Sequence, residues 1–144
     1  MGRFDDRRRA REAALQMLYA WEVGRVPLDE AMATYWGVQE AAPSEPVRAY
    51  AEALVRATAD RLAEIDRLIA GAAERWRPER MAAVDRLILR LATGELLAAE
   101  GVPPAVVIDE ALELARRYSG EEAVRFVNGV LDTIRRELAR QTAD

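Results

Sequence analysis

The segment from Ala82 to Ala99 constrains the fold most, because apolar residues cover nearly every side of the helix that it predicts. These apolar positions are Val84, Leu87, Ile88, Leu89, Leu91, Ala92, Leu96 and Leu97. A helix that is apolar all round presents no face to water and belongs in the interior of a bundle. The rest of the chain must therefore supply helices that surround it.

The other segments have apolar residues on one helical face, at spacings of three and four. They predict helices at about 6–23, 28–36, 47–69, 105–118 and from 119 through 138. The inward stripe of the 105–118 helix ends at Tyr118. No stretch alternates as a strand would, so we expect an all-α protein. Trp76, Arg77 and Pro78 interrupt the pattern, which predicts two packed helical subdomains, at about 1–76 and 77–144, within a single domain.

The amino-acid composition excludes several classes of protein and of functional site. At 144 residues, with 51% hydrophobic and 32% charged residues, the chain fits one globular domain. It has neither an apolar stretch of roughly 18 residues nor an apolar signal core, so we expect a cytoplasmic protein. Cysteine and histidine are absent, which excludes disulfides, thiolate nucleophiles, imidazole bases and the usual zinc sites. This leaves catalysis few tools, and we expect no catalytic residues, no metal and no cofactor.

The first eleven residues are basic although the chain has a net charge of −4. They contain Arg3, Arg7, Arg8, Arg9 and Arg11 with only two aspartates. Cations at a helix start oppose the helix dipole, and that conflict disappears when a phosphate binds there. The cluster therefore favours nucleic-acid binding. A frayed, solvated basic tail is the alternative.

Four segments carry a family resemblance: RRRAREAALQMLYAWE at 7–22, VDRLILRLATGEL at 84–96, VVIDEALELAR at 106–116 and FVNGVLD at 126–132. Together and in this order they resemble the NusB family of bacterial transcription antitermination factors. Only the region from Pro27 to about residue 75 lacks recognisable motifs. The resemblance implies two packed helical subdomains and no enzymatic activity. It also implies a heterodimer with NusE, a small-subunit ribosomal protein. This pair binds single-stranded boxA RNA and joins a complex that makes RNA polymerase resist termination.

The resemblance also implies site residues. Glu95 matches an acidic position at the NusE interface. The positions that match RNA-binding residues, or a surface that faces RNA, are Arg7, Arg8, Arg9, Arg11, Tyr19, Phe126, Asn128 and Asp132. The chain departs from the pattern at Gly94, where the family commonly has an aromatic residue, and at Asp109, where it commonly has asparagine. The first departure bears on how the partner docks.

Spacing alone leaves alternatives open at two of these positions. Glu95 shares a helix flank with core residues, so an internal salt bridge with Arg86 or Arg90 competes with a partner contact. Phe126 is offset from the core stripe of the last helix, so it either stacks on an RNA base or packs at the edge of the core.

Two glycines lie inside helical patterns, Gly94 and Gly129, where glycine costs roughly 0.8–1 kcal/mol relative to alanine. The close approach of a second backbone would explain both. The acidic run of Asp109, Glu110 and Glu113 precedes Arg116 and Arg117, which favours a solvated face with ion pairs over a metal site.

The competing functions are a helical protein-interaction scaffold that does not bind RNA directly and a family member that forms homodimers. In the scaffold, the arginines would be a solvated tail.

Overall fold

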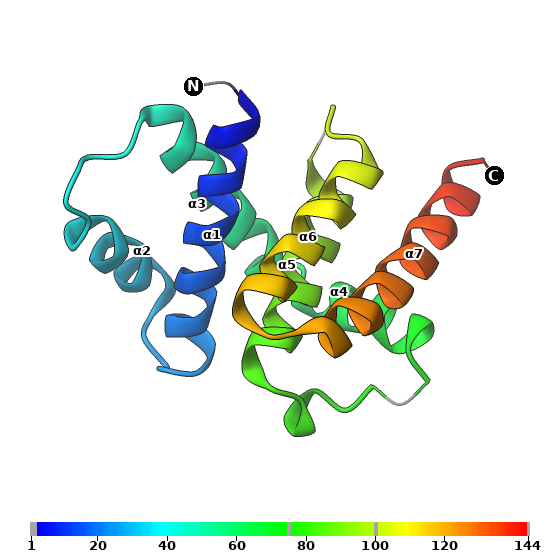
Figure 1. Cartoon of the computed structure of the whole chain (residues 1–144). Helices are drawn as coiled ribbons and strands as arrows, with labels where there is room; N and C mark the ends of the chain where they lie inside the picture. The colour runs from blue at the N-terminus through cyan, green and yellow to red at the C-terminus, as the bar shows by residue number, and fades with distance from the viewer. Residues whose placement is uncertain (1–2, 75, 100, 144) are drawn as a thin grey trace.

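The computed structural model describes residues 3–74, 76–99 and 101–143. These residues form α1 (Arg3–Glu22), α2 (Leu28–Gly37), α3 (Glu45–Asp60), α4 (Leu62–Ala72), the 3-10 turn η1 (Pro78–Arg80), α5 (Ala83–Ala98), α6 (Pro104–Tyr118) and α7 (Glu121–Ala143). The described ranges contain no strand, and the all-α prediction is confirmed (Figure 1). Within the same ranges, no helix combines the length and the apolar character needed to cross a membrane.

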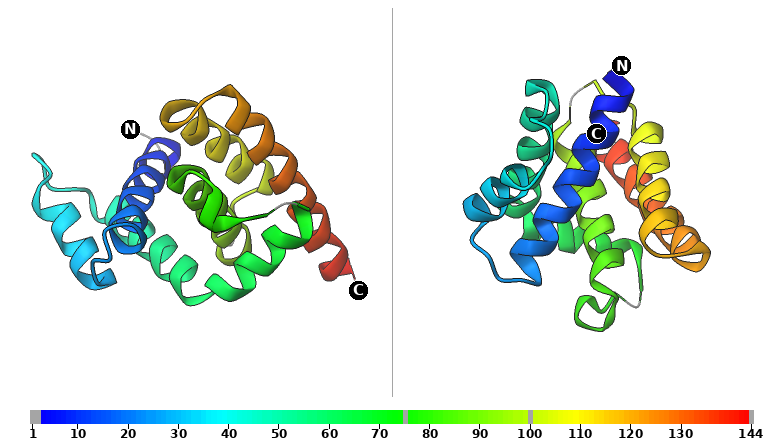
Figure 2. Two further views of the ribbon diagram at one scale, coloured as in Figure 1. Left: turned by 90° about the horizontal axis from the view of Figure 1, so that it is seen from below. Right: turned by 60° about the vertical axis from the view of Figure 1, so that its left-hand side comes forward.

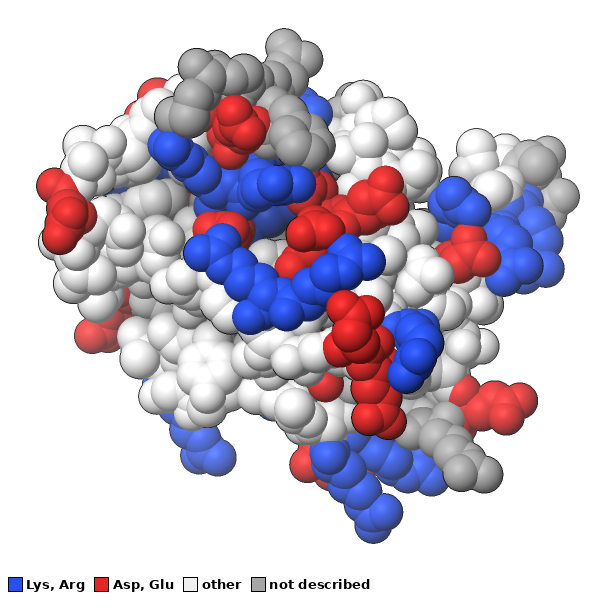
Figure 3. Space-filling view, in the orientation of Figure 1, with Lys and Arg blue, Asp and Glu red and all other residues white. Residues whose placement is uncertain are grey.

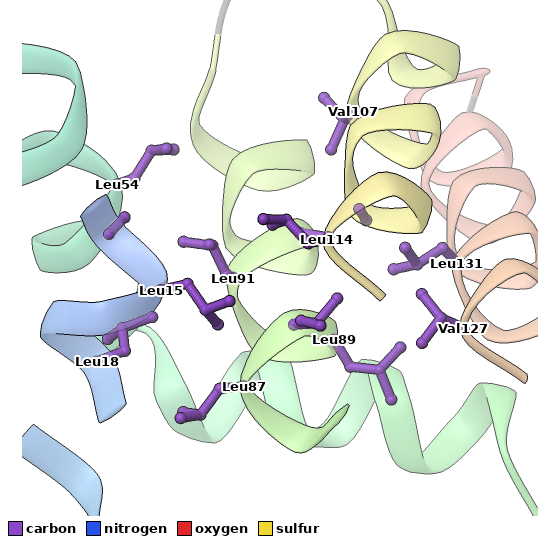
Figure 4. Close-up of a cluster of buried hydrophobic side chains, with 14 of the residues drawn as sticks. Leu15, Leu18, Leu54, Leu87, Leu89, Leu91, Val107, Leu114, Val127 and Leu131 are labelled. Carbon is purple, nitrogen blue, oxygen red and sulfur yellow. The ribbon is translucent and has the colours of Figure 1, made fainter. Parts of the chain in front are cut away.

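Helix α5 is the centre of the bundle, as its sequence predicts. Every residue from Leu87 to Glu95 is buried, and α5 packs against α1, α3, α4, α6 and α7. Figure 4 shows leucines and valines of α1, α3, α6 and α7 converging on Leu87, Leu89 and Leu91 of α5. A helix that is apolar all round is stable in this position because each of its faces meets another helix.

The remaining helices form two groups around α5, which Figures 1 and 2 show from three directions. Helices α1, α2 and α3 pack together on one side, while α4 and α6 pack with α7 on the other. The sequence division near residue 76 assigns α4 to the first half, but α4 packs against α5 and α7. The change from one group to the other therefore occurs near Arg61. A single apolar core runs through both groups.

The prediction of a single helix at 47–69 is wrong, because α3 ends at Asp60 and α4 begins at Leu62. Arg61 between them has φ −111° and ψ 23°, outside the helical region. The hydroxyl of Thr58 donates to the carbonyl of Leu54 at 2.8 Å, a contact that bends helices. The bend turns α4 away from α3 and onto α7.

The two glycines within helices have different surroundings. A Cβ on Gly94 would lie 2.6 Å from Oγ1 and 3.4 Å from Cα of Thr58, so the close approach predicted there is confirmed. Helices α3 and α5 cross at this point, and the crossing leaves no room for an aromatic side chain before Glu95. At Gly129 the prediction is wrong, because a Cβ would meet nothing within 4 Å.

Candidate nucleic-acid interface

Helix α1 begins at Arg3, three residues before the predicted start at about residue 6, and it includes the whole arginine cluster. Successive helical residues turn by about 100°, which gives each arginine a different environment. The side chain of Arg7 is half-buried, Arg8 and Arg9 are exposed, and Arg11 is buried at 3% exposure. The alternative of a solvated basic tail is therefore wrong for Arg11. The cluster divides into a surface part, Arg7 to Arg9, and an internal residue, Arg11.

Arg11 forms an internal ion pair with Glu95 of α5. Its Nε donates to Oε1 at 2.8 Å and its Nη2 donates to Oε2 at 2.6 Å. Burial alone would lower the pKa of Arg11, but the hydrogen bonds and the charge of Glu95 outweigh burial and raise it. The pair is the bidentate arrangement that suits guanidinium and carboxylate. Arg11 offers almost no exposed surface for a phosphate in this structure.

Glu95 is 2% exposed, so it too is internal. The alternative of an internal salt bridge is confirmed, but its expected partners are wrong. Arg86 and Arg90 instead pair with Glu22 at 2.8 and 3.0 Å, and Arg90 also pairs with Asp66. A direct contact between Glu95 and another protein would require the carboxylate to leave Arg11.

The phenol of Tyr50, on α3, completes this buried cluster. Its hydroxyl donates to Oε2 of Glu95 at 2.6 Å. Burial, together with the hydrogen bond to Glu95, raises the pKa of Tyr50 to about 12, so the phenol stays protonated at neutral pH. The cluster of Arg11, Glu95 and Tyr50 thus joins α1, α5 and α3.

A charged groove of about 240 Å³ lies between α1 and α6. On its floor, Glu110 accepts two hydrogen bonds from Nε of Arg8, at 3.1 and 3.2 Å, which together with its charge raise the pKa of Arg8. Arg117 of α6 bridges to Glu12 of α1 across the groove. Figure 3 shows arginine and acidic side chains interleaved over these two helices.

The acidic run of α6 only partly fits the solvated face that we expected. Glu113 is exposed and pairs with Arg116 at 2.5 Å, but Glu110 is buried and lies 3.9 Å from Arg11. The described residues contain no group of three or more acidic side chains placed to hold a metal ion.

Among the side chains whose burial the structure describes, three large aromatic ones are exposed on α1, α6 and α7. Tyr19 of α1 is 45% exposed, Phe126 of α7 is 42% exposed and Tyr118 of α6 is 38% exposed. The inward assignment of Tyr118 is wrong, because it is the last residue of α6 and its ring reaches past the core. The guanidinium of Arg117 lies 5.6 Å from the ring centroid of Tyr118. Tyr118 is therefore a further candidate for base stacking, which its position in the apolar stripe did not indicate.

The other predicted residues of α7 lie apart from Phe126. Asn128 is exposed, and Asp132 forms ion pairs with Arg135 and Arg136 at 2.7 and 3.0 Å. Two helical steps place Asn128 about 160° from Phe126 around the axis, so the buried stripe of α7 separates them. The structure does not bring Asn128 and Asp132 together with Phe126 on one face.

The buried positions of Arg11 and Glu110 had a signal in the sequence. Arg11 precedes Ala14, Leu15 and Leu18 at spacings of three, four and seven, and all three are buried. Glu110 lies three residues after Val107 and four before Leu114, which are also buried. A charged residue that occupies a position of an apolar stripe indicates a buried ion pair.

Comparison with known proteins gives one consistent result. The NusB family model matches residues 8–136. The transcription antitermination protein NusB of Solibacter usitatus (strain Ellin6076) is 48% identical over 95% of this chain and 93% of its own length. The structure of T. maritima NusB superposes with a TM-score of 0.82 at 38% identity, covering 91% of each chain. A crystal structure of antitermination factors NusB and NusE in complex with dsRNA matches with a TM-score of 0.84 at 28% identity, covering 95% of this chain and 99% of that one.

Proposed function

Because this chain belongs to the NusB family, we propose that it is an RNA-binding transcription antitermination factor that pairs with NusE on boxA RNA. The observation that carries the proposal is the match over nearly the whole chain to a NusB that was crystallised with NusE and RNA. The matched residues include most of the arginine-bearing helix. The protein would act in the cytoplasm on nascent ribosomal RNA transcripts, and it would catalyse no reaction.

The surface of the molecule supports RNA binding. Arg8 and Arg9 are exposed on α1, and guanidinium groups suit bidentate contact with phosphates. Tyr19, Tyr118 and Phe126 expose ring surface on which bases can stack, and base stacking adds roughly 1–3 kcal/mol for each base. Cations beside exposed aromatic rings are typical of proteins that bind single-stranded nucleic acid.

The proposed function is tested by titrating a short single-stranded boxA RNA with the full chain, alone and with NusE, at about 0.1 M salt. We expect NusE to increase the affinity and a scrambled RNA of the same length to bind more weakly. A NusE complex that binds neither RNA would contradict the proposal and would favour a protein-interaction scaffold. Sedimentation of the chain alone tests the homodimer.

Replacing Phe126 with alanine is expected to weaken boxA binding roughly 5- to 150-fold, because base stacking is worth roughly 1–3 kcal/mol. The melting temperature should change little, since the ring is 42% exposed. Val127→Ala is the matched control because Val127 is the next residue and is fully buried. It should lower the melting temperature and leave RNA affinity unchanged. The same pattern in Phe126→Ala would assign Phe126 to the edge of the core.

A further inference from the structure

Tyr50 lies between the buried ion pair and the surface arginines of α1. Its hydroxyl is fixed by Glu95 at 2.6 Å, and Glu95 is fixed in turn by Arg11. Its ring lies under two guanidinium groups, with Cζ of Arg7 at 5.3 Å and Cζ of Arg11 at 5.9 Å from the ring centroid. Both distances are within the range of cation–π attraction.

Arg7 differs from Arg8 and Arg11 in how its charge is held. Arg8 donates to Glu110, and Arg11 donates to Glu95. In the part of the chain that the structure describes, no carboxylate lies within ion-pair distance of Arg7. The face of an aromatic ring attracts a cation without neutralising its charge, so Arg7 keeps a full positive charge to offer to a phosphate.

The contact with Tyr50 also limits the motion of Arg7. A free arginine side chain samples many rotamers, and part of this freedom is lost when it binds a ligand. A ring anchored at its hydroxyl is a rigid support, because both of its side-chain torsions are restrained. Arg7 resting on this ring is therefore ordered before a ligand arrives, which reduces the entropy lost on binding.

We propose that Tyr50 is a positioning residue for RNA binding, which holds Arg7 in place to contact a backbone phosphate. The inference rests on the proposed function. It gives a role in RNA binding to Tyr50 of α3, which lies in the region without recognisable family motifs. Tyr50 need not touch the RNA. It acts through Arg7, and the hydroxyl bond to Glu95 keeps its ring in position.

The test is a double-mutant cycle between Tyr50→Leu and Arg7→Ala, measured as affinity of the full chain with NusE for boxA RNA at low salt. Tyr50→Leu removes the ring and should weaken binding about 2- to 5-fold, the equivalent of one exposed cation–π contact. In the Arg7→Ala background the same change should have no further effect. Tyr50→Phe keeps the ring but loses its hydrogen bond to Glu95, so it should recover only part of the affinity.

Trp76→Leu is the control for lost stability, because Trp76 is a buried residue of the segment that joins α4 to η1 in the chain, outside the arginine cluster. It should lower the melting temperature without changing RNA affinity. Equal losses from Tyr50→Leu with and without Arg7 would overturn the inference, as would no loss in either background. Absence of RNA binding by the wild-type complex would contradict the proposed function itself.

NMR of the wild-type protein supplies a second measurement, for the case that Tyr50→Leu fails to fold. The side-chain protons of Arg7 should show a ring-current shift in the free protein, and addition of RNA should change the Arg7 Nε–Hε signal. An Arg7 side chain with random-coil shifts in the free protein, or one unaffected by RNA, would contradict the inference.

Discussion

Glu95→Ala is expected to lower the free energy of unfolding by about 3–5 kcal/mol, the usual cost of breaking a buried ion pair by removing one partner. The loss is large because Arg11 would remain buried at 3% exposure without its bidentate partner. Tyr50 would also lose the acceptor of its hydroxyl. Denaturant unfolding measures the effect, with Glu64→Ala as a control because Glu64 makes its ion pair with Arg61 at the surface.

A second variant separates this internal role of Glu95 from a direct contact with NusE. Arg11→Met combined with Glu95→Leu removes both charges and keeps apolar volume, an exchange that is often neutral or stabilising. The burial of Glu95 leads us to expect a stable double variant whose NusE affinity, measured by calorimetry, is close to that of wild type. A stable double variant that no longer binds NusE would show that the carboxylate contacts the partner.

Replacing Arg7, Arg8 and Arg9 together with alanine is expected to weaken RNA binding roughly 30- to 100-fold at about 0.1 M salt. Each phosphate contact on a single strand adds about 0.7 to the slope of log affinity against log salt concentration. Two or three contacts would therefore account for a slope change of about 1.5–2 and for the lost affinity. The loss should be similar for all RNA sequences, because phosphate contacts do not read bases.

The structure adds a stability effect to this triple variant. Arg8 donates two hydrogen bonds to the buried Glu110, so its removal should also lower the melting temperature. The triple lysine variant is the control, since it keeps the positive charges and should keep most of the salt dependence. An alanine variant with an unchanged slope would mean that the RNA is held elsewhere on the molecule.

The helices were predictable where the apolar pattern was long and complete. The central position of α5 follows from its residues alone, because only an interior position accommodates a helix that is apolar all round. The bend at Arg61 was not predictable, since the apolar repeat continues through it from Leu54 to Ile65. What divides α3 from α4 is packing on different neighbours, and that information is distributed over the whole chain.

Several residues of the candidate site were predictable from the sequence, but the contacts between them were not. The sequence indicates an arginine cluster, and the apolar spacing after Arg11 signals that this residue turns inward. It does not identify the partner of Arg11, because Glu95 lies 84 positions later in the chain. The role of Tyr50 depends on the crossing of α3 and α5, and no local pattern reports such a crossing. The reason for a glycine at position 94 becomes clear only in the structure, where Thr58 of α3 lies against it.

The pair of Arg11 and Glu95 also bears on the order in which the chain folds during synthesis. Helices α1, α2 and α3 emerge from the ribosome before α5 does, and until α5 emerges Arg11 has no carboxylate to accompany it into the interior. Burying an unpaired guanidinium is costly, so the first group of helices can associate only loosely at that stage. Its core closes when α5 brings Glu95 to Arg11 and the backbone of Gly94 to Thr58. The N-terminal helices are thus a late-closing unit, although they are made first.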